Sequence, residues 1–369
     1  MEKTAKTANF YDVKEDWGEV KKRWEAWWDF DIYDRPLICV TAPKKHPRVP
    51  PELEGFEYEE NDFVRKWADI DYMTDKMLYE YYSTWYGGES VPVLKYGGSV
   101  GHALTFGCEP VFAKDTIWAN ALLPKDGGEY PEICFDENNR WWRKYCETVE
   151  KTAAASKQRY FSSAKLGNHA GDNFSICRGS EALLYDLIDN PRWVRDNLKY
   201  ISDVLIGQFE ALYELTPLTG LEGYANTVDC WSPKKTREYD TDFSCMISPE
   251  HFKDIFLPPL IETMHKDDHC IYHLDGITAM RSHLDTLLEV EDIDAFQWVP
   301  GDGHWEALQW VPLLQKIQAR KKSVFCYVSE DAVIPVLKEL RPEGLCICTS
   351  AASEDGARRL IESVERASR

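Results

Sequence analysis

The sequence predicts an α/β fold, a (β/α)8 barrel with an N-terminal helical extension. From about residue 136 to the end, short apolar segments alternate with amphipathic segments of helical length, and such alternation indicates a parallel sheet with helical crossovers. A length of 369 residues suits one barrel, and no low-complexity linker divides the chain. We therefore expect a helical extension over 1–34 and the barrel over 35–369. A doubly wound open sheet is the structural alternative.

The first half of the chain carries the weaker part of the pattern. Trp17, Val20, Trp24 and Trp27 share one helical face, which is typical of an amphipathic helix packed across a barrel. The apolar run 37–41 is typical of a buried parallel strand. The remaining expectations here are a loop over 42–60, a helix over 61–83, and a strand over 91–94 with a glycine-rich loop over 97–101.

The second half alternates more regularly. Asn190 before Pro191, and Ser248 before Pro249, have the residue types of an N-cap and a first helical position. The predicted strands cover 160–166, 220–224, 270–273, 293–298, 323–328 and 344–348. The predicted helices cover 138–157, 179–187, 191–215, 284–290, 306–321, 332–340 and 353–367, with a further helix that starts after Ser248.

Composition and charge exclude several classes of protein. A hydrophobic fraction of 44% supports a large core, and the formal net charge of −20 disfavours nucleic acid and anionic membranes as partners. The N-terminus lacks an apolar signal region, and no apolar run approaches the length of a membrane span. With 11 cysteines, an odd number, we expect free thiols in a reducing cytoplasm.

Four segments carry a resemblance to a known family. They read RGSEALLYDLIDNP over 178–191, DFSCMISPEHF over 242–252 with a proline at 258, YHLDG over 272–276, and QWVPG over 297–301. In this order and spacing they resemble the uroporphyrinogen decarboxylase superfamily, over about residues 160–369. The resemblance implies a barrel whose active site lies at the carboxyl ends of the strands, and a possible homodimer.

Within that superfamily, the sequence is more similar to the cobamide-dependent methyltransferases than to the porphyrin decarboxylases. The decarboxylases grip their substrate's carboxylates with paired arginines near the N-terminus, whereas the segment 35–41 offers a single arginine. The methyltransferase resemblance implies transfer of a methyl group between a small methoxy, methylamine or thiol compound and a corrinoid. Because the sequence lacks an Asp-x-His-x-x-Gly motif, we expect the corrinoid on a partner protein.

The same resemblance implies a zinc site. Thiol-alkylating members of the branch hold zinc with a His-x-Cys pair and a cysteine at the end of the last strand. His273 and Cys348 match by residue type, and Asp275 stands where the family has a thiolate. Zinc accepts nitrogen, sulfur and carboxylate ligands. A carboxylate makes zinc more electrophilic, which favours a methoxy or methylamine donor, with zinc acting as Lewis acid.

Other polar and aromatic residues follow predicted strands and are further candidates. For acid–base catalysis the candidates are His169, Asp172 and Asp275, and for substrate binding they are Tyr224, Asp229, Trp231, Asp242, Gln297 and Trp298. For each of these residues the alternative interpretation is a structural role in packing or in a turn. Three other functions stay open: a metal-free decarboxylase of a small carboxylic acid, a carbohydrate-active barrel, and a binding protein without catalytic activity.

Overall fold

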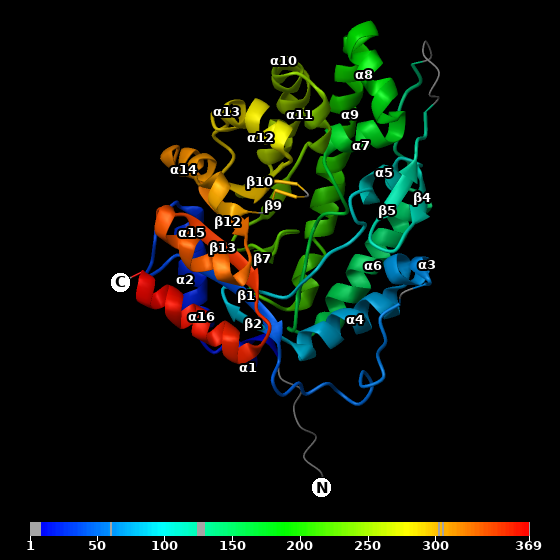
Figure 1. Cartoon of the computed structure of the whole chain (residues 1–369). Helices are drawn as coiled ribbons and strands as arrows, with labels where there is room; N and C mark the ends of the chain where they lie inside the picture. Colours follow the sequence, from blue (N-terminus) through cyan, green and yellow to red (C-terminus); the bar gives the residue numbers. More distant parts are fainter. Residues whose placement is uncertain (1–8, 60, 124–129, 302, 305, 369) are drawn as a thin grey trace.

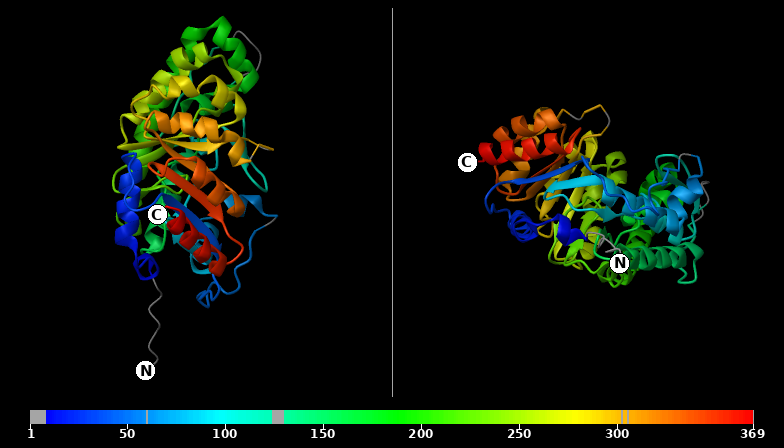
Figure 2. Two further views of the ribbon diagram at one scale, coloured as in Figure 1. Left: turned by 60° about the vertical axis from the view of Figure 1, so that its left-hand side comes forward. Right: turned by 90° about the horizontal axis from the view of Figure 1, so that it is seen from below.

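The centre of the molecule is a seven-stranded, mostly parallel sheet with helices around it (Figures 1 and 2). The computed structural model describes residues 9–59, 61–123, 130–301, 303–304 and 306–368. All neighbouring strands in the sheet are parallel except β1 and β2. In spatial order the strands are β2 (Thr84–Gly88), β1 (Leu37–Pro43), β13 (Leu345–Ser350), β12 (Ser323–Tyr327), β11 (Ala295–Val299), β10 (His269–Asp275) and β9 (Thr236–Tyr239).

The expected closed barrel is not found among the described residues. The hydrogen-bonded ladder ends at β2 and at β9, and the remaining strands form three separate pairs. These pairs are β3 (Val93–Leu94) with β6 (Phe161–Ser162), β4 (Glu109–Phe112) with β5 (Ile117–Asn120), and β7 (Tyr224–Ala225) with β8 (Trp231–Ser232). Where strands were predicted over 160–166 and 220–224, only two residues of each of β6 and β7 join a ladder, so the ring of hydrogen bonds is interrupted.

Helices follow the strands along the chain and cover the sheet. Those that come before β9 are α1 (Phe10–Val13), α2 (Trp17–Trp28), α3 (Phe63–Ala68), α4 (Ile70–Ser83), α5 (Gly101–Thr105), α6 (Arg140–Ser156), α7 (Ala170–Arg178), α8 (Ser180–Asp189) and α9 (Pro191–Tyr213). Those that come after β9 are α10 (Pro249–His251), α11 (Leu257–Met264), α12 (Ile277–Ser282), α13 (Leu284–Leu287), α14 (Val311–Ala319), α15 (Val333–Glu339) and α16 (Glu354–Ala367). None of the helices in the described ranges is both long and apolar enough to cross a membrane.

Helix α2 packs as its apolar face predicts. Trp24 and Trp27 are fully buried and belong to one apolar cluster with Phe325 of β12. The Trp28 indole N–H donates to the carbonyl of Trp231 at 2.8 Å. The polar N–H group of this buried indole therefore has a hydrogen-bond partner within an otherwise apolar contact. The tryptophans of this segment therefore build core.

Strand register aligns the polar residues that matter for the site. His273 of β10 lies opposite Gln297 of β11, and Cys348 of β13 lies opposite Cys39 of β1. Because β9 to β13 are parallel, their carboxyl ends meet at one edge of the sheet, which is where open α/β folds bind their ligands.

Candidate functional site

A cavity of about 470 Å3 opens at the carboxyl ends of β9, β10 and β11. Titratable side chains from these strands and from the segment after β6 line one part of it: Lys165, Glu238, Asp240, Asp242 and His273. Trp67, Met73 and Tyr96 contribute apolar surface. A mostly apolar wall with a few converging polar groups is the usual character of a small-molecule site.

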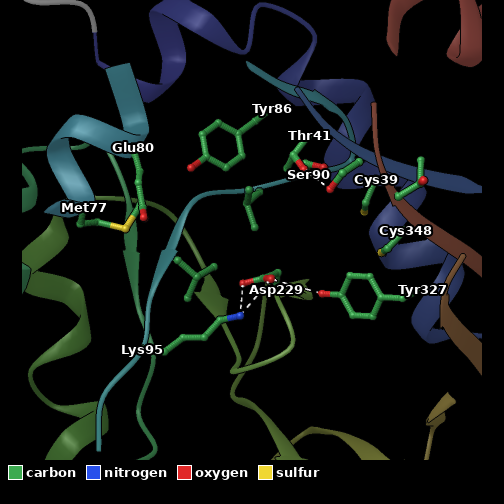
Figure 3. Close-up of a pocket in the computed structure, with 14 residues that line it drawn as sticks. Cys39, Thr41, Met77, Glu80, Tyr86, Ser90, Lys95, Asp229, Tyr327 and Cys348 are labelled. Carbon is green, nitrogen blue, oxygen red and sulfur yellow. Dashed lines mark hydrogen bonds and ion pairs between the residues drawn. The ribbon is translucent and has the colours of Figure 1, made fainter. Parts of the chain in front are cut away.

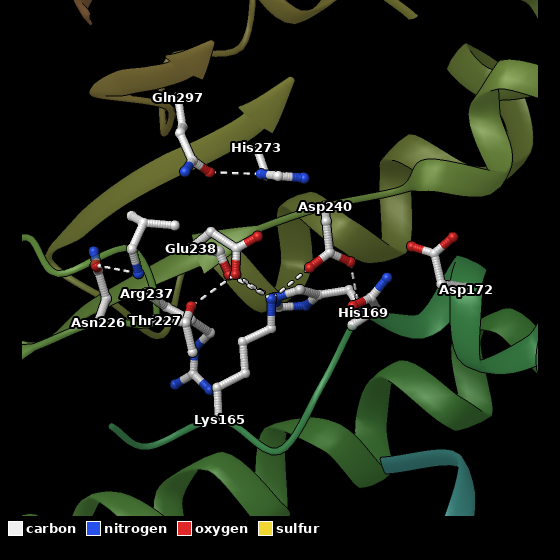
Figure 4. A network of polar contacts seen from close by, with 12 residues as sticks. Lys165, His169, Asp172, Asn226, Thr227, Arg237, Glu238, Asp240, His273 and Gln297 are labelled. Carbon is white, nitrogen blue, oxygen red and sulfur yellow. Dashed lines mark hydrogen bonds and ion pairs between the residues drawn. The ribbon is translucent and has the colours of Figure 1, made fainter. Parts of the chain in front are cut away.

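Lys165 is the centre of a buried ion-pair network (Figure 4). Its ammonium lies 2.5 Å from Glu238 Oε2 and also donates to a carboxylate oxygen of Asp240. Burial alone would raise the pKa of Glu238, but the charges of Lys165 and His273 overcome it and lower that pKa to about 2. Burial works against the ammonium of Lys165, yet the two carboxylates hold its pKa above the ordinary value. The network therefore keeps a charged lysine in the wall of the cavity.

His273 is oriented by Gln297, with its second ring nitrogen left for another ligand. Nδ1 of His273 lies 2.5 Å from the side-chain oxygen of Gln297, an acceptor, so Nδ1 carries the proton. In the neutral ring Nε2 has the free lone pair, and this atom lies 3.9 Å from Oδ2 of Asp275. Burial would lower the pKa of His273, but the charges of Glu238 and Asp242 raise it above the ordinary value.

One donor atom from each of Asp242, His273 and Asp275 lies within 4.8 Å of the other two. Among the described residues, Oδ1 of Asp242 is buried without a hydrogen-bond partner, and a buried carboxylate oxygen in that state is costly unless a cation or proton meets it. Burial and the charge of Asp240 raise the pKa of Asp242 to about 7, although His273 opposes them. Two carboxylates and an imidazole form a donor set that suits a divalent cation.

Residues around α7 hold this group in place. The carboxylate of Asp172 accepts hydrogen bonds from the backbone N–H of Asp242 at 3.0 Å and of Phe243 at 2.7 Å. The backbone N–H of His169 donates to Asp240 at 2.8 Å, and the His169 ring stacks on Tyr239 with centroids 4.5 Å apart. Both predicted acid–base residues on this segment are buried and act on the backbone and packing around the acidic cluster.

A second cavity of about 240 Å3 lies next to the first, and Lys95 lines both (Figure 3). Lys95 forms an ion pair with Asp229 at 2.9 Å, and the hydroxyl of Tyr327 lies 3.5 Å from the same carboxylate. Cys39 and Cys348 line the opposite end. Asp229 therefore lines the smaller cavity.

Three buried thiols meet beside this second cavity. Sulfur atoms of Cys39, Cys346 and Cys348 lie within 4.8 Å of one another, so this group also could hold a metal ion. Burial alone would raise the pKa of Cys39, but hydrogen bonds with Cys346 and Cys348 lower it to about 6.

The structure divides the predicted zinc ligands between these two groups. His273 and Asp275 join Asp242, whereas Cys348 joins Cys39 and Cys346. The reason is topological, since two strands, β11 and β12, separate β10 from β13 in the sheet.

The other predicted binding residues fall into two sets. Asp242 and Gln297 line the larger cavity and Asp229 the smaller one. Trp231 is fully buried against Trp17, with ring centroids 5.2 Å apart. Trp298 packs against Trp310 and Tyr224 against Tyr213, with centroids 6.3 and 5.5 Å apart. These three aromatic residues are outside the sets that line the two cavities.

Sequence reasoning did not single out Lys95, Lys165, Glu238 or Asp240. Glu238 lies on β9, whose Thr-Arg-Glu-Tyr sequence has no apolar run to mark it as a strand. A usable signal was the alternation of Glu238, Asp240 and Asp242, because residues two apart on an extended segment share a face.

The fold and the site define an α/β protein with an acidic, cation-competent cavity at the carboxyl ends of its strands. No protein-family model matches the sequence, and no curated protein matches it. Among solved structures, the fold is similar to that of a methyltransferase from Methanosarcina mazei, with a TM-score of 0.60 and 12% identity. The alignment covers 94% of this chain and 98% of that chain. At this identity the likeness shows a shared fold over nearly the whole length.

Proposed function

We propose that the protein is a methyltransferase that moves a methyl group between a small methylated compound and a corrinoid carried by a partner protein. The observation that carries the proposal is the convergence of Asp275 with Asp242 and His273, two residues that line the larger cavity. The shared fold with a methyltransferase supports the same reaction class. The short strands lie beside the sheet beyond β9, because β7 contacts both β9 and β6.

The donor set fits zinc without Cys348. Gln297 fixes the ring of His273 so that Nε2 faces Asp275, and outer hydrogen bonds of this kind orient metal-bound histidines. The unpartnered Oδ1 of Asp242 supplies a second oxygen ligand. In this proposal Asp242 takes the third position that the sequence resemblance gave to Cys348.

When bound, zinc would supply Lewis acidity toward the heteroatom that carries the methyl group. The methyl group leaves without its bonding electrons, which remain on the heteroatom. Lys165, Glu238 and Asp240 hold the acidic wall rigid through their buried ion pairs. Lys95 also lines the cavity and would contact a polar end of the substrate.

The cavity limits the size and type of the methyl donor. About 470 Å3 accommodates a small molecule, and a corrinoid macrocycle would remain outside on its own carrier. Oxygen and nitrogen ligands make a harder zinc site than thiolates do. A methoxy compound or a methylamine therefore fits the site better than a thiol.

The test is methyl transfer to free cob(I)alamin by zinc-loaded protein, with a panel of methoxy compounds, methylamines and methyl thioethers. Formation of methylcobalamin is followed by its absorption spectrum. We expect one donor class to react, and His273→Ala and Asp242→Asn to abolish the reaction. His265→Ala, which removes an exposed histidine paired with Asp292, is the matched control and should keep it. Turnover that survives His273→Ala and chelation would refute the proposal.

One observation favours decarboxylation as a second candidate. The carboxyl of Asp242, with a pKa raised to about 7 by burial and by Asp240, could protonate a carbanion left after CO2 departs. Lys95 could pair with the substrate's carboxylate. Release of CO2 from a small carboxylic acid, unaffected by chelator and lost in Asp242→Asn, would favour this function over methyl transfer.

A further inference from the structure

A cluster of three thiols lies outside the acidic group. Cys39 is on β1 and faces Cys348 across the parallel ladder to β13, while Cys346 precedes Cys348 by two residues on the same strand. Residues two apart on a strand share a face, so all three sulfur atoms lie on one side of the sheet. Figure 3 shows the sulfur atoms of Cys39 and Cys348 directed toward one another at the end of the smaller cavity.

The separation of the sulfur atoms is compatible with a shared metal ion. Sγ of Cys39 lies 3.9 Å from Sγ of Cys346, and all three sulfurs are within 4.8 Å of one another. Zinc–sulfur bonds of about 2.3 Å in tetrahedral geometry place two sulfurs about 3.8 Å apart. The three donors would move little to bind a cation.

Charge around the cluster also favours a divalent cation. Three thiolates and a divalent ion carry a net charge of −1. The buried ammonium of Lys14 donates to the carbonyl of Gly88 at 2.5 Å, and Gly88 pairs with Cys39 in the β1–β2 ladder. A basic side chain is therefore hydrogen-bonded to the neighbouring strand, although burial lowers the pKa of Lys14.

The buried carboxylate of Glu89 also lies near the three thiols, but its negative charge is neutralised by two arginines. Glu89 is fully buried and forms ion pairs with Arg35 at 2.8 Å and with Arg23 at 3.2 Å. Its charge is met by these guanidinium groups. Lys14 lies near Asp16 and Glu89 as well as Cys39, and the charges of all three raise its pKa against the effect of burial.

We propose that Cys39, Cys346 and Cys348 bind a thiophilic divalent cation, Zn²⁺ under cellular conditions, which crosslinks the first strand of the chain to the last. Cys39 and Cys348 line the smaller cavity and give the ion a route of entry. Thiolates select soft cations, whereas Asp242, His273 and Asp275 offer oxygen and nitrogen donors. Metal binding by the three thiols does not depend on methyl transfer, so the two proposals are tested independently.

The competing interpretation is that the three cysteines are small apolar core residues. Cys326 provides the comparison, since it is fully buried on the adjacent strand β12 and is outside the three-thiol group. If burial alone explains the cluster, Cys326 and Cys39 should respond in the same way to a thiophilic metal.

The test is titration of the reduced, metal-free full-length protein with Co²⁺, followed by thiolate-to-cobalt charge-transfer absorption in the near ultraviolet. We expect one equivalent to produce the band, Zn²⁺ to displace it, and Cys39→Ser or Cys348→Ser to remove it. Cys326→Ser and His273→Ala should retain it. The melting temperature of the wild-type protein should rise with Zn²⁺ concentration, because the cation binds the folded state, and Cys39→Ser should lose most of that rise.

Each contrary result overturns the proposal. If Co²⁺ produces no thiolate-to-cobalt band in the wild-type protein, the proposal is wrong, whether or not the serine variants fold. A band that survives in folded Cys39→Ser and Cys348→Ser would place the metal elsewhere. Loss of the band in His273→Ala would assign the ion to the acidic group and refute a separate thiol site.

Discussion

Replacement of Lys165 by Met removes the only cation in the ion-pair network with Glu238 and Asp240 among the described residues, and should be strongly destabilising. The Lys165 side chain is 4% exposed, and those of Glu238 and Asp240 are 9% and 3% exposed. Methionine fills similar space but leaves two buried carboxylates without the ammonium that neutralises them. Removal of one member of a buried pair costs about 3–5 kcal/mol, so we expect the free energy of unfolding to fall by about that amount.

The pH dependence of this loss follows from the pKa of Glu238. In the wild-type protein Lys165 helps to hold that pKa at about 2, so Glu238 contributes stability above its ordinary pKa and loses it only as the pH falls toward 2. Without the ammonium, burial raises the pKa of both carboxyls, and their ionisation opposes folding. The deficit of the variant should therefore shrink as the pH falls from about 7 to about 4.

Urea denaturation of both proteins at several pH values measures these quantities. Lys199→Met is the matched control, because Lys199 also forms a 2.5 Å ion pair, with Asp203, but is 50% exposed. That change should cost no more than about 1 kcal/mol. A Lys165→Met deficit no larger than that of the control, or one that does not depend on pH, would contradict the network described above.

Three further predictions concern the metal group, a helix cap and the core. Gln297→Leu should weaken zinc affinity about 10- to 100-fold because His273 loses its orienting hydrogen bond; isothermal titration with zinc measures this, and an unchanged affinity would exclude the role given to Gln297. Asn190→Ala should destabilise the protein by about 1 kcal/mol, because the side chain accepts a hydrogen bond from the backbone N–H of Trp193; a denaturation midpoint equal to that of wild type would argue against the cap. Trp27→Ala should cost about 3–5 kcal/mol, because the indole is fully buried; thermal unfolding tests this, and a loss under 1 kcal/mol would mean that α2 is not part of the core.

Local patterns predicted many of the helices and strands. The Asn190–Pro191 and Ser248–Pro249 signals mark the starts of α9 and α10, where both side chains cap the helix. The predicted strand over 323–328 corresponds to β12 (Ser323–Tyr327). These features depend on contacts within a few residues, which a sequence displays directly.

Other elements depend on contacts that a sequence does not display. α7 (Ala170–Arg178) lies outside all the predicted helices, and its start is held by a hydrogen bond from the backbone N–H of His169 to Asp240. The expected helix over 61–83 is broken at Asp69, which caps α4. β2 (Thr84–Gly88) was missed because its strand character comes from antiparallel pairing with β1.

The candidate site was predicted in part. His273, Asp275, Asp242 and Gln297 were singled out, and the structure brings them together at the larger cavity or its edge. The pairing of Cys348 with Cys39 depends on strand order, because β13 is next to β1 and is separated from β10 by two strands. Spacing along the chain could not supply that order.

The most direct test of the account is anomalous X-ray scattering at the zinc edge from crystals of the zinc-loaded protein. The account predicts a peak bounded by Nε2 of His273 and by carboxylate oxygens of Asp242 and Asp275. A map without density at that point, while zinc is bound elsewhere in the same crystals, would contradict it.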